Sequence, residues 1–343
     1  MNEISTRYSN LCEIENRLSG ISFELTNDCN FSCSHCYRVH GANYFDRELF
    51  YKVLDEAENL GAIFVSFNGG EPTLHPDFLE FCLEILTRGL HLAVLTNGTG
   101  LSKNIVDSLV PYKTVQFQIS LYGTDRESGR RITGSPSAFE QTLFTIHFLV
   151  SRGVDVIVSL LARKDTSQNL PKLIEYLNNN KIKYILMPNL TSKENGEKLT
   201  KDLFADESDL TELLSLESQR ILDTLEPNSS HFPDAERVRA CSAGITSLGI
   251  RVNGDIVSCQ VFIRPVFGNS RFLSLSQVMS GEPRRAFLDE NFYPSTCKIC
   301  EVANYCMRCP ADALAETGSL TGIPAESCRI ARLRAKFHID SQR

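Results

Sequence analysis

The sequence predicts an α/β protein whose parallel sheet and surrounding helices are followed by a smaller cysteine-rich region. Six apolar runs rich in β-branched and aromatic residues alternate with segments of helical periodicity. The chain has 343 residues, which exceeds the usual size of one domain, so we expect a large domain with a smaller one. Seven of the twelve cysteines lie after residue 240, which predicts a different kind of structure there.

The predicted sheet begins after residues 1–20, a polar lead that is too short to form a domain. The expected strands span 21–26, 63–68, 91–96, 114–120, 154–161 and 183–190. Helical patterns lie between the strands, such as the one over 46–60, which ends at a glycine suited to a helix C-cap. Strands and helices that alternate at this spacing require parallel βαβ units, which leaves a half-open (β/α)6 barrel or a doubly wound open sheet.

A second domain is expected after a helix over about 207–226. Residues 226–234 have the proline, asparagine and serine content of a linker. We therefore place the first domain at 21–226 and the second at 227–343. Within the second domain, the pattern around Asn253-Gly254 predicts a β-hairpin with this dipeptide at its turn.

Composition and charge exclude several classes of protein. The 35 basic and 42 acidic residues give a formal charge of −7, which argues against a sequence-independent nucleic-acid binder. No apolar run is long enough to span a membrane, and the polar start lacks the features of a signal peptide. We therefore expect a cytoplasmic protein, where thiols stay reduced and metal ligation explains the cysteines better than disulfides do.

Three cysteines follow the first predicted strand in one short loop, at Cys29, Cys33 and Cys36. A four-iron cluster needs four ligands, so three thiolates on one loop would leave one iron free for a ligand that is not protein. The carboxyl end of a barrel strand is also where α/β barrels place their chemistry. A zinc site or a group of buried thiols remains the alternative, although structural zinc usually takes four protein ligands.

The second predicted strand leads into a glycine-rich turn formed by Gly69, Gly70, Glu71 and Pro72. The two glycines would let the backbone approach a ligand closely, and the carboxylate beside them could receive a ligand ammonium group. A Gly-Gly-Xaa-Pro sequence is also typical of any tight turn. The turn is therefore a candidate ligand site that needs support from other features.

The cysteine loop matches the CxxxCxΦC signature of radical S-adenosylmethionine (radical SAM) enzymes, with His35 at the aromatic position, and the chain resembles that family. The resemblance implies a partial (β/α)6 radical SAM barrel and decides between the two sheet alternatives. It also implies that Cys29, Cys33 and Cys36 hold a 4Fe-4S cluster whose open iron binds SAM. One electron then cleaves SAM to a 5′-deoxyadenosyl radical that abstracts hydrogen from the substrate.

The same resemblance assigns further SAM contacts. The Gly69–Pro72 turn corresponds to the family's GGEP motif, whose backbone binds the SAM amino group, and His35 is also assigned to the cofactor site. Asn97 and Ser120 follow later strands at positions that contact SAM in the family, although a hydroxyl such as that of Ser120 can also cap a strand. In the segment after the fourth strand, Gly129-Arg130 replaces a His-Asp pair of the family, so Arg130 and Arg131 either neutralise a ligand carboxylate or are simply solvated.

The C-terminal cysteines resemble the SPASM extension of radical SAM enzymes, a domain that holds auxiliary iron–sulfur clusters. By this resemblance, auxiliary cluster I takes Cys241, Cys259 and Cys309, and auxiliary cluster II takes Cys297, Cys300, Cys306 and Cys328. Three features depart from the family pattern. Two residues instead of three precede Cys309, no cysteine lies in 226–240, and Gln260 replaces the aspartate that serves as base in sulfatase-maturing members. The fourth position of cluster I is then open or filled by a residue such as His231, Asp234 or Glu236, and zinc ribbons are the structural alternative for these cysteines.

Three classes of function follow. The favoured class is a radical SAM/SPASM enzyme that modifies a ribosomally made peptide by cross-linking, epimerisation or oxidation at an unactivated C–H bond. The alternatives are a radical SAM dehydrogenase of a small molecule and an electron carrier without catalysis, and Gln260 disfavours the sulfatase-maturing type. The expected partners are a precursor peptide and a flavodoxin or ferredoxin reductant. Because residues 1–20 leave no room for a leader-binding domain, either a separate small protein presents the peptide or the barrel and SPASM surfaces bind it directly. Epimerisation would need a thiol hydrogen donor, either Cys12, Cys82 or a freed cluster ligand.

Overall fold

The computed structural model describes residues 3–191, 193–194, 201–224, 242–262, 264–290 and 294–340. Six parallel strands form the first part of its sheet: β1 (Gly20–Thr26), β2 (Phe64–Gly69), β3 (His91–Thr96), β4 (Val115–Leu121), β5 (Asp155–Leu161) and β6 (Lys183–Met187). They match the expected strands to within one residue, except that β6 ends three residues early, and Met187 is followed by proline, which cannot donate to a strand ladder.

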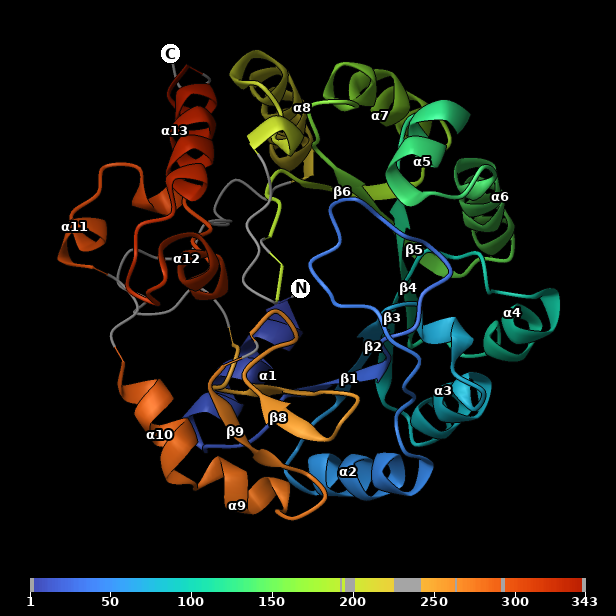
Figure 1. Ribbon diagram of the computed structural model, residues 1–343, viewed down its shortest axis with the longest axis vertical. Coiled ribbons are helices and arrows are strands. Elements are labelled where there is room, and N and C mark those ends of the chain that lie inside the picture. Colours follow the sequence, from blue (N-terminus) through green and yellow to red (C-terminus); the bar gives the residue numbers. More distant parts are fainter. Residues whose placement is uncertain are drawn as a thin grey trace.

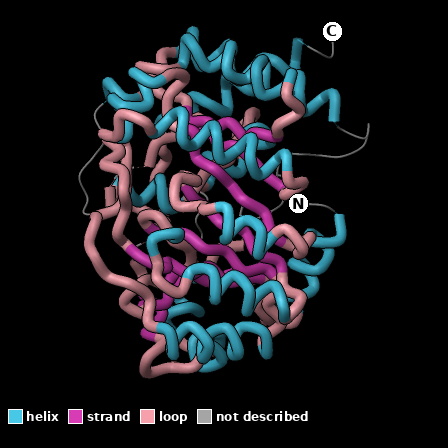
Figure 2. The backbone as a smooth tube through the Cα atoms, turned by 90° about the vertical axis from the view of Figure 1, so that its right-hand side faces the viewer, coloured by secondary structure: helices cyan, strands magenta, loops and turns pink. Residues whose placement is uncertain are grey.

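The strands lie in the order β6-β5-β4-β3-β2-β1, so each one pairs with its neighbour in sequence. A doubly wound sheet would reverse its direction at an internal strand. The absence of such a reversal among the described strands confirms the partial barrel and excludes the open-sheet alternative. Helices surround the curved sheet on its outer side (Figure 1), and the strands run obliquely through the interior of the molecule (Figure 2).

The sheet continues beyond β1 into the C-terminal part of the chain. Strand β7 (Ser247–Ile250) pairs in parallel with β1, from Gly20 opposite Ser247 to Phe23 opposite Ile250. Strands β8 (Asp255–Val257) and β9 (Val266–Asn269) then add in antiparallel order. The expected hairpin is present, and it extends the barrel sheet instead of standing apart from it.

Side chains alternate across the sheet because successive residues of a strand point to opposite faces. On the outer face, Phe23, Phe67 and the helix residues Phe50 and Phe81 form an aromatic core, in which the Phe50 and Phe81 rings stack with centroids 3.9 Å apart. The inner face carries polar side chains, among them Ser22, which lies opposite Ser66 in the neighbouring strand. The aromatic core is therefore outside the barrel, and hydrogen-bonding groups are found on the inner side.

The helices that cover the barrel have recognisable start and stop signals. They are α1 (Glu3–Ile14), α2 (Arg47–Asn59), α3 (Phe78–Thr87), α4 (Lys103–Leu109), α5 (Arg126–Thr133), α6 (Ala138–Ser151), α7 (Leu170–Asn179) and α8 (Glu207–Thr224). Asp46 caps α2 by accepting a hydrogen bond from Leu49 N. Asp125 and Ser128 form a capping box at α5, which ends at Gly134 in the left-handed region.

Helix α1 lies in the polar lead, where the sequence predicts no element. Two of its apolar side chains, Leu11 and Ile14, are exposed, so the segment lacks the clear apolar stripe that predicts a surface helix. Its contacts are instead with distant segments, such as a hydrogen bond between the hydroxyls of Ser9 and Thr246 at 3.2 Å. Such long-range contacts leave no mark in the local sequence.

The C-terminal region adds α9 (Leu275–Met279), α10 (Glu282–Asp289), α11 (Ser295–Lys298), α12 (Pro310–Thr317) and α13 (Ala325–Asp340). Helix α13 packs against α8 of the barrel. Figure 1 shows α11 to α13 beside the open side of the curved sheet, between its two ends. Among the described residues, no helix combines the length and apolar character needed to cross a membrane. The linker expected at 226–234 lies outside the described residues.

Candidate functional site

The three cysteines of the N-terminal motif lie in the loop that follows β1, at the carboxyl end of the barrel strands. All three are free thiols of intermediate exposure. Burial raises the pKa of Cys29 to about 11. Burial also raises the pKa of Cys33, and the neighbouring Cys36 and Cys29 raise it further. The thiols therefore lie close enough to interact, and a bound metal cluster would be needed to hold them all as thiolates.

The loop from Asn27 to Arg38, here called the cluster loop, is fixed by backbone hydrogen bonds to neighbouring turns. Gly70 N donates to Thr26 O and Glu71 N donates to Asp28 O, each at 2.8 Å. On the other side, Ser32 N donates to the carbonyl of Thr133 at 2.8 Å. The turn after β2 and the end of α5 thus hold the loop from both sides.

The two glycines of the turn after β2 are required by packing against the cluster loop. A Cβ atom at Gly69 would lie 2.2 Å from Thr26 O, and one at Gly70 would lie 2.0 Å from Asp28 O. Gly69 also has a φ of +133°, which side-chain-bearing residues rarely adopt. The close approach that these glycines allow is to the protein's own backbone.

Glu71 faces the interior and is fully buried. Its Oε1 accepts hydrogen bonds from the Thr73 hydroxyl at 2.6 Å and the Thr96 hydroxyl at 2.5 Å, and its Oε2 accepts one from Asn97 N at 2.8 Å. Burial raises the pKa of this carboxyl. The side chain ties the turn after β2 to the end of β3, so the expected contact between its carboxylate and a ligand ammonium group is not available. Pro72, also buried, opens the short 3₁₀ turn that follows.

Asn97 connects the end of β3 to the cluster loop. Its Nδ2 donates to Asn30 Oδ1 at 2.8 Å, and Asn30 in turn donates to the Thr99 hydroxyl at 2.7 Å. Asn30 directly follows Cys29, so this hydrogen bond holds the cluster loop next to its first cysteine. Asn97 is thus placed at the cluster loop, whereas Ser120 lies in β4 and hydrogen-bonds the side chain of Tyr122.

His35 is held between an aromatic ring and an arginine. Its ring lies edge-on to Tyr122 with centroids 4.7 Å apart, and Arg163 Nη1 lies 3.2 Å from its Nδ1. Burial, together with the charge of Arg163, lowers the pKa of His35 to about 3. Because the guanidinium can only donate, Nδ1 is the acceptor and the neutral ring carries its proton on Nε2.

Arg163 is a site residue that the sequence does not reveal. It follows β5, is 3% exposed, and also donates to the Ser34 hydroxyl at 3.1 Å while pairing with Asp165 at 2.9 Å. The sequence feature that could have indicated Arg163 is a cation directly after a buried strand, at the end of the barrel where the chemistry takes place. In contrast, Arg130 and Arg131 are about half exposed and pair with Glu127 and Asp165.

Replacing Arg163 by methionine is expected to weaken SAM binding, because the cluster loop loses two of its side-chain hydrogen bonds. Partners that orient metal ligands typically contribute roughly 10–100-fold in affinity or activity. Equilibrium binding of SAM to the reconstituted protein measures the change. Arg130→Met, which breaks only an exposed ion pair, is the matched control and should bind SAM as the unmodified protein does. Equal affinities of the two variants would contradict the assigned role.

The C-terminal cysteines form two groups. Cys259 lies just after β8, and Cys309 is the N-cap of α12. Burial raises the pKa of Cys309 to about 12, with a smaller contribution from Cys259. These two proposed ligands of auxiliary cluster I are therefore neighbours. The third, Cys241, lies outside the described residues, as do the possible ligands His231, Asp234 and Glu236.

The second group contains Cys297, Cys300, Cys306 and Cys328. Burial raises the pKa of Cys306, and the other three cysteines add to this effect. Four thiols from α11, the following turn and α13 thus lie near one another, as the proposed auxiliary cluster II requires. Among the described residues, no three His, Cys, Asp or Glu side chains converge closely enough to hold a single metal ion.

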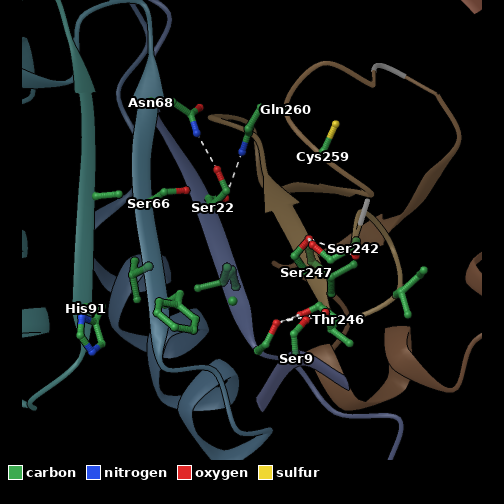
Figure 3. Close-up of a pocket in the computed structure, with 18 of the residues that line it drawn as sticks. Ser9, Ser22, Ser66, Asn68, His91, Ser242, Thr246, Ser247, Cys259 and Gln260 are labelled. Atoms are coloured by element: carbon green, nitrogen blue, oxygen red, sulfur yellow. Dashed lines mark hydrogen bonds between the residues drawn. The ribbon is translucent and has the colours of Figure 1, made fainter. Parts of the chain in front are cut away.

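A cavity of about 1130 Å³ lies inside the barrel (Figure 3). It reaches the amino ends of the strands, because its wall includes Gly20, Phe64 and His91, the first residues of β1, β2 and β3. Most of the labelled side chains in its wall are neutral and polar, and they include Ser22, Ser66, Asn68 and Gln260. The Gln260 amide nitrogen donates to the carbonyls of Ser22 at 3.0 Å and Ile250 at 3.2 Å, which joins the hairpin to β1. Cys259 also lines the cavity, so the lumen extends from the barrel strands to the auxiliary site.

Three thiols at the end of the first barrel strand, with two further groups of thiols in the C-terminal region, are typical of an iron–sulfur enzyme. Residues 23–177 match the model of the Radical SAM superfamily, and residues 241–310 match that of SPASM, an iron–sulfur cluster-binding domain. The chain is therefore a radical SAM enzyme with a SPASM domain. Its cofactors are iron–sulfur clusters and S-adenosylmethionine.

Similar proteins extend over most of the chain. A tungsten-containing aldehyde ferredoxin oxidoreductase cofactor-modifying protein of Pyrococcus furiosus is 25% identical over 82% of this chain and 87% of its own length. A PqqA peptide cyclase of Ruegeria pomeroyi is 24% identical over 85% of this chain and 83% of its own.

Two solved structures share the fold. Streptococcus suis SuiB bound to S-adenosylmethionine has a TM-score of 0.72 at 18% identity and covers 94% of this chain and 80% of its own. Native anSMEcpe with bound AdoMet has a TM-score of 0.75 at 16% identity, covering 94% of this chain and 97% of its own. These likenesses confirm the fold.

Proposed function

We propose that this radical SAM/SPASM enzyme modifies a ribosomally synthesised peptide at an unactivated C–H bond, by cross-linking or oxidation. The observation that carries the proposal is the lumen, whose wall runs from the barrel strands to Cys259 of the SPASM region. Its volume of about 1130 Å³ exceeds the roughly 300–1,000 Å³ that is usual for small-ligand pockets. A peptide segment fits such a space better than a single small metabolite.

The neutral polar side chains of the lining suit a peptide segment, and Glu13, Lys113, Asp155 and Arg284 also belong to the wall. Serine, asparagine and glutamine side chains can exchange hydrogen bonds with peptide amides and hydroxyls, and they do not demand a charge on the ligand. When bound, the SAM cofactor supplies hydrogen-atom abstraction, and Cys29, Cys33 and Cys36 would hold its cluster. The residues of the lumen would orient the target residue and exclude water from it.

Relatives with named activities agree with this class. One relative is a PqqA peptide cyclase, and the fold is shared with SuiB in a structure with its precursor peptide SuiA. Another structure of the same fold holds anSMEcpe with AdoMet and a peptide. Together these proteins support a peptide as the substrate, and they leave the bond that is formed open.

Two reactions considered from the sequence, sulfatase maturation and epimerisation, receive less support. Gln260 is neutral and its amide nitrogen is engaged by two carbonyls, so it cannot serve as the base that the sulfatase-maturing type requires. Epimerisation by a free thiol is also disfavoured, because Cys12 and Cys82 are buried in the core outside the lumen, 2% and 0% exposed. Cross-linking or oxidation needs no such thiol, because a cluster held by Cys259 and Cys309 would supply an acceptor for the electron.

The test is a reaction of the anaerobically reconstituted enzyme with SAM, dithionite and a short peptide encoded beside its gene. We expect 5′-deoxyadenosine to form and the peptide to lose about two mass units per cross-link or oxidation, since a pair of hydrogens leaves the substrate. Tandem mass spectrometry locates the change. Deoxyadenosine without any change in the peptide, together with turnover of a small alcohol, would instead support the dehydrogenase alternative. Flavodoxin or ferredoxin in place of dithionite tests the proposed reductant.

A further inference from the structure

Four charged side chains from distant segments meet next to the cluster loop. Glu24 lies in β1, Arg38 follows Cys36 by two residues, Glu194 lies in the chain after β6, and Arg251 follows β7. Their side chains are between 2% and 16% exposed. We call these four residues the buried charge network.

The contacts in the network alternate in sign. The Glu24 carboxylate pairs with Arg38 and, at 3.3 Å, with Arg251. Arg251 also pairs with Glu194 at 2.6 Å, and the hydrogen bond lowers the pKa of Glu194 against the effect of its burial. Two cations and two anions thus balance within the protein interior, where an unbalanced charge would be costly.

Backbone groups join the same three segments. Val39 N in the chain after Arg38 donates to Glu194 Oε1 at 2.7 Å, and Glu194 N donates to the carbonyl of Tyr37 at 2.8 Å. On the hairpin side, Val252 N donates to Glu24 Oε2 at 3.2 Å. The end of the cluster loop, the chain after β6 and the hairpin turn are therefore held to one another.

The position of the network gives it a role beyond stability. Arg38 lies two residues after Cys36 of the cluster loop. Arg251 and Val252 begin the hairpin turn, which leads through β8 to Cys259. A shift of either segment must move charges that the other segment neutralises. The two cysteine-bearing segments are coupled through one set of ion pairs.

We propose that the buried charge network is a positioning device that fixes the cluster loop relative to the hairpin carrying Cys259. The four residues are positioning residues, since none of them is placed on the substrate. The SPASM hairpin is then part of the structure that holds the SAM-binding loop. This inference depends on the two cysteine sites and not on the identity of the peptide.

The test compares Glu24→Gln, Arg38→Met and the double variant, each as anaerobically reconstituted holoprotein. Each single change leaves one uncompensated charge, whereas the double variant keeps Arg251 paired with Glu194 and restores the balance. Hydrogen exchange followed by mass spectrometry is read over 29–40 and 247–258. We expect each single variant to raise exchange roughly tenfold in both segments, and the double variant to raise it less than either single variant.

SAM affinity is the second readout. Each single variant should bind SAM about 10–100-fold more weakly, with recovery in the double variant. Arg130→Met, at an exposed ion pair, is the control and should change neither readout. If Arg38→Met fails to fold, Arg38→Lys keeps the charge but loses the planar guanidinium, and it should show the same coupled increase in exchange on a smaller scale. Exchange that rises in only one of the two segments would overturn the proposal. A double variant whose effects are the sum of the two single effects would also overturn it, whether or not a peptide is modified.

Discussion

Replacing Cys29, Cys33 and Cys36 together by alanine is expected to abolish the cleavage of SAM while leaving the iron of the SPASM domain in place. Reconstituted enzyme with three cubane clusters would hold about twelve irons per chain, and the variant should hold about eight. Deoxyadenosine formation should fall to background, because the structure offers no other described thiols near the end of β1 to hold the cluster. Iron and sulfide analysis beside a dithionite-driven assay measures both quantities.

The control for this experiment is Cys82→Ala. Cys82 is fully buried in α3, where burial raises its pKa well above the usual range, so it behaves as a small apolar core residue. The variant should keep its iron and its SAM cleavage. Cleavage that survives in the triple variant, or zinc found in place of iron, would refute the assignment of the cluster loop.

The strands of the barrel can be predicted from the sequence because they are buried on their outer face and bounded by turns. Residues such as Phe23 and Phe67 mark that face, and the run of strands at constant spacing predicts parallel pairing. The cysteine motifs can be predicted for a different reason. Their chemistry depends on spacing along the chain, as at Cys29, Cys33 and Cys36, and such spacing is visible without a structure.

The roles of single polar residues are harder to predict because they depend on contacts between distant segments. Glu71 stands beside two glycines, which predicts that it faces a ligand, but it accepts hydrogen bonds from Thr96 and Asn97 in the interior. Arg163 contacts Ser34 and His35, which lie far earlier in the chain. The sequence contains no local sign of such contacts, since register and curvature decide which strand ends meet.

The glycine turn provides the clearest example, because its sequence is compatible with a ligand contact and with backbone packing. The structure favours packing at Gly70, whose α-carbon faces the carbonyl of Asp28, the residue before Cys29. The hydrogen bonds from Gly70 N to Thr26 O and from Glu71 N to Asp28 O lie at the same place. Any displacement of the turn is therefore transmitted directly to the first cysteine.

Gly70→Ala is accordingly expected to displace the cluster loop and to cause the largest loss among single substitutions of the turn. A methyl group 2.0 Å from a backbone oxygen cannot be accommodated by a side-chain rotation, so the loop or the turn must move. Overpacking of this kind typically costs about 1–3 kcal/mol of folding free energy. We expect that cost in denaturant unfolding of the apoprotein, together with the loss of roughly four irons from the reconstituted enzyme.

Gly89→Ala separates this effect from the general consequences of replacing a glycine. Gly89 has a φ of +78°, and no neighbouring atom lies within 4 Å of the position that a methyl group would take, so alanine there meets only backbone strain of roughly 1–2 kcal/mol. That variant should lose a similar amount of stability but keep all its iron and its SAM cleavage. If Gly70→Ala also keeps its iron, the turn does not set the position of the cluster loop, and the close approach of its backbone would have to serve the ligand instead.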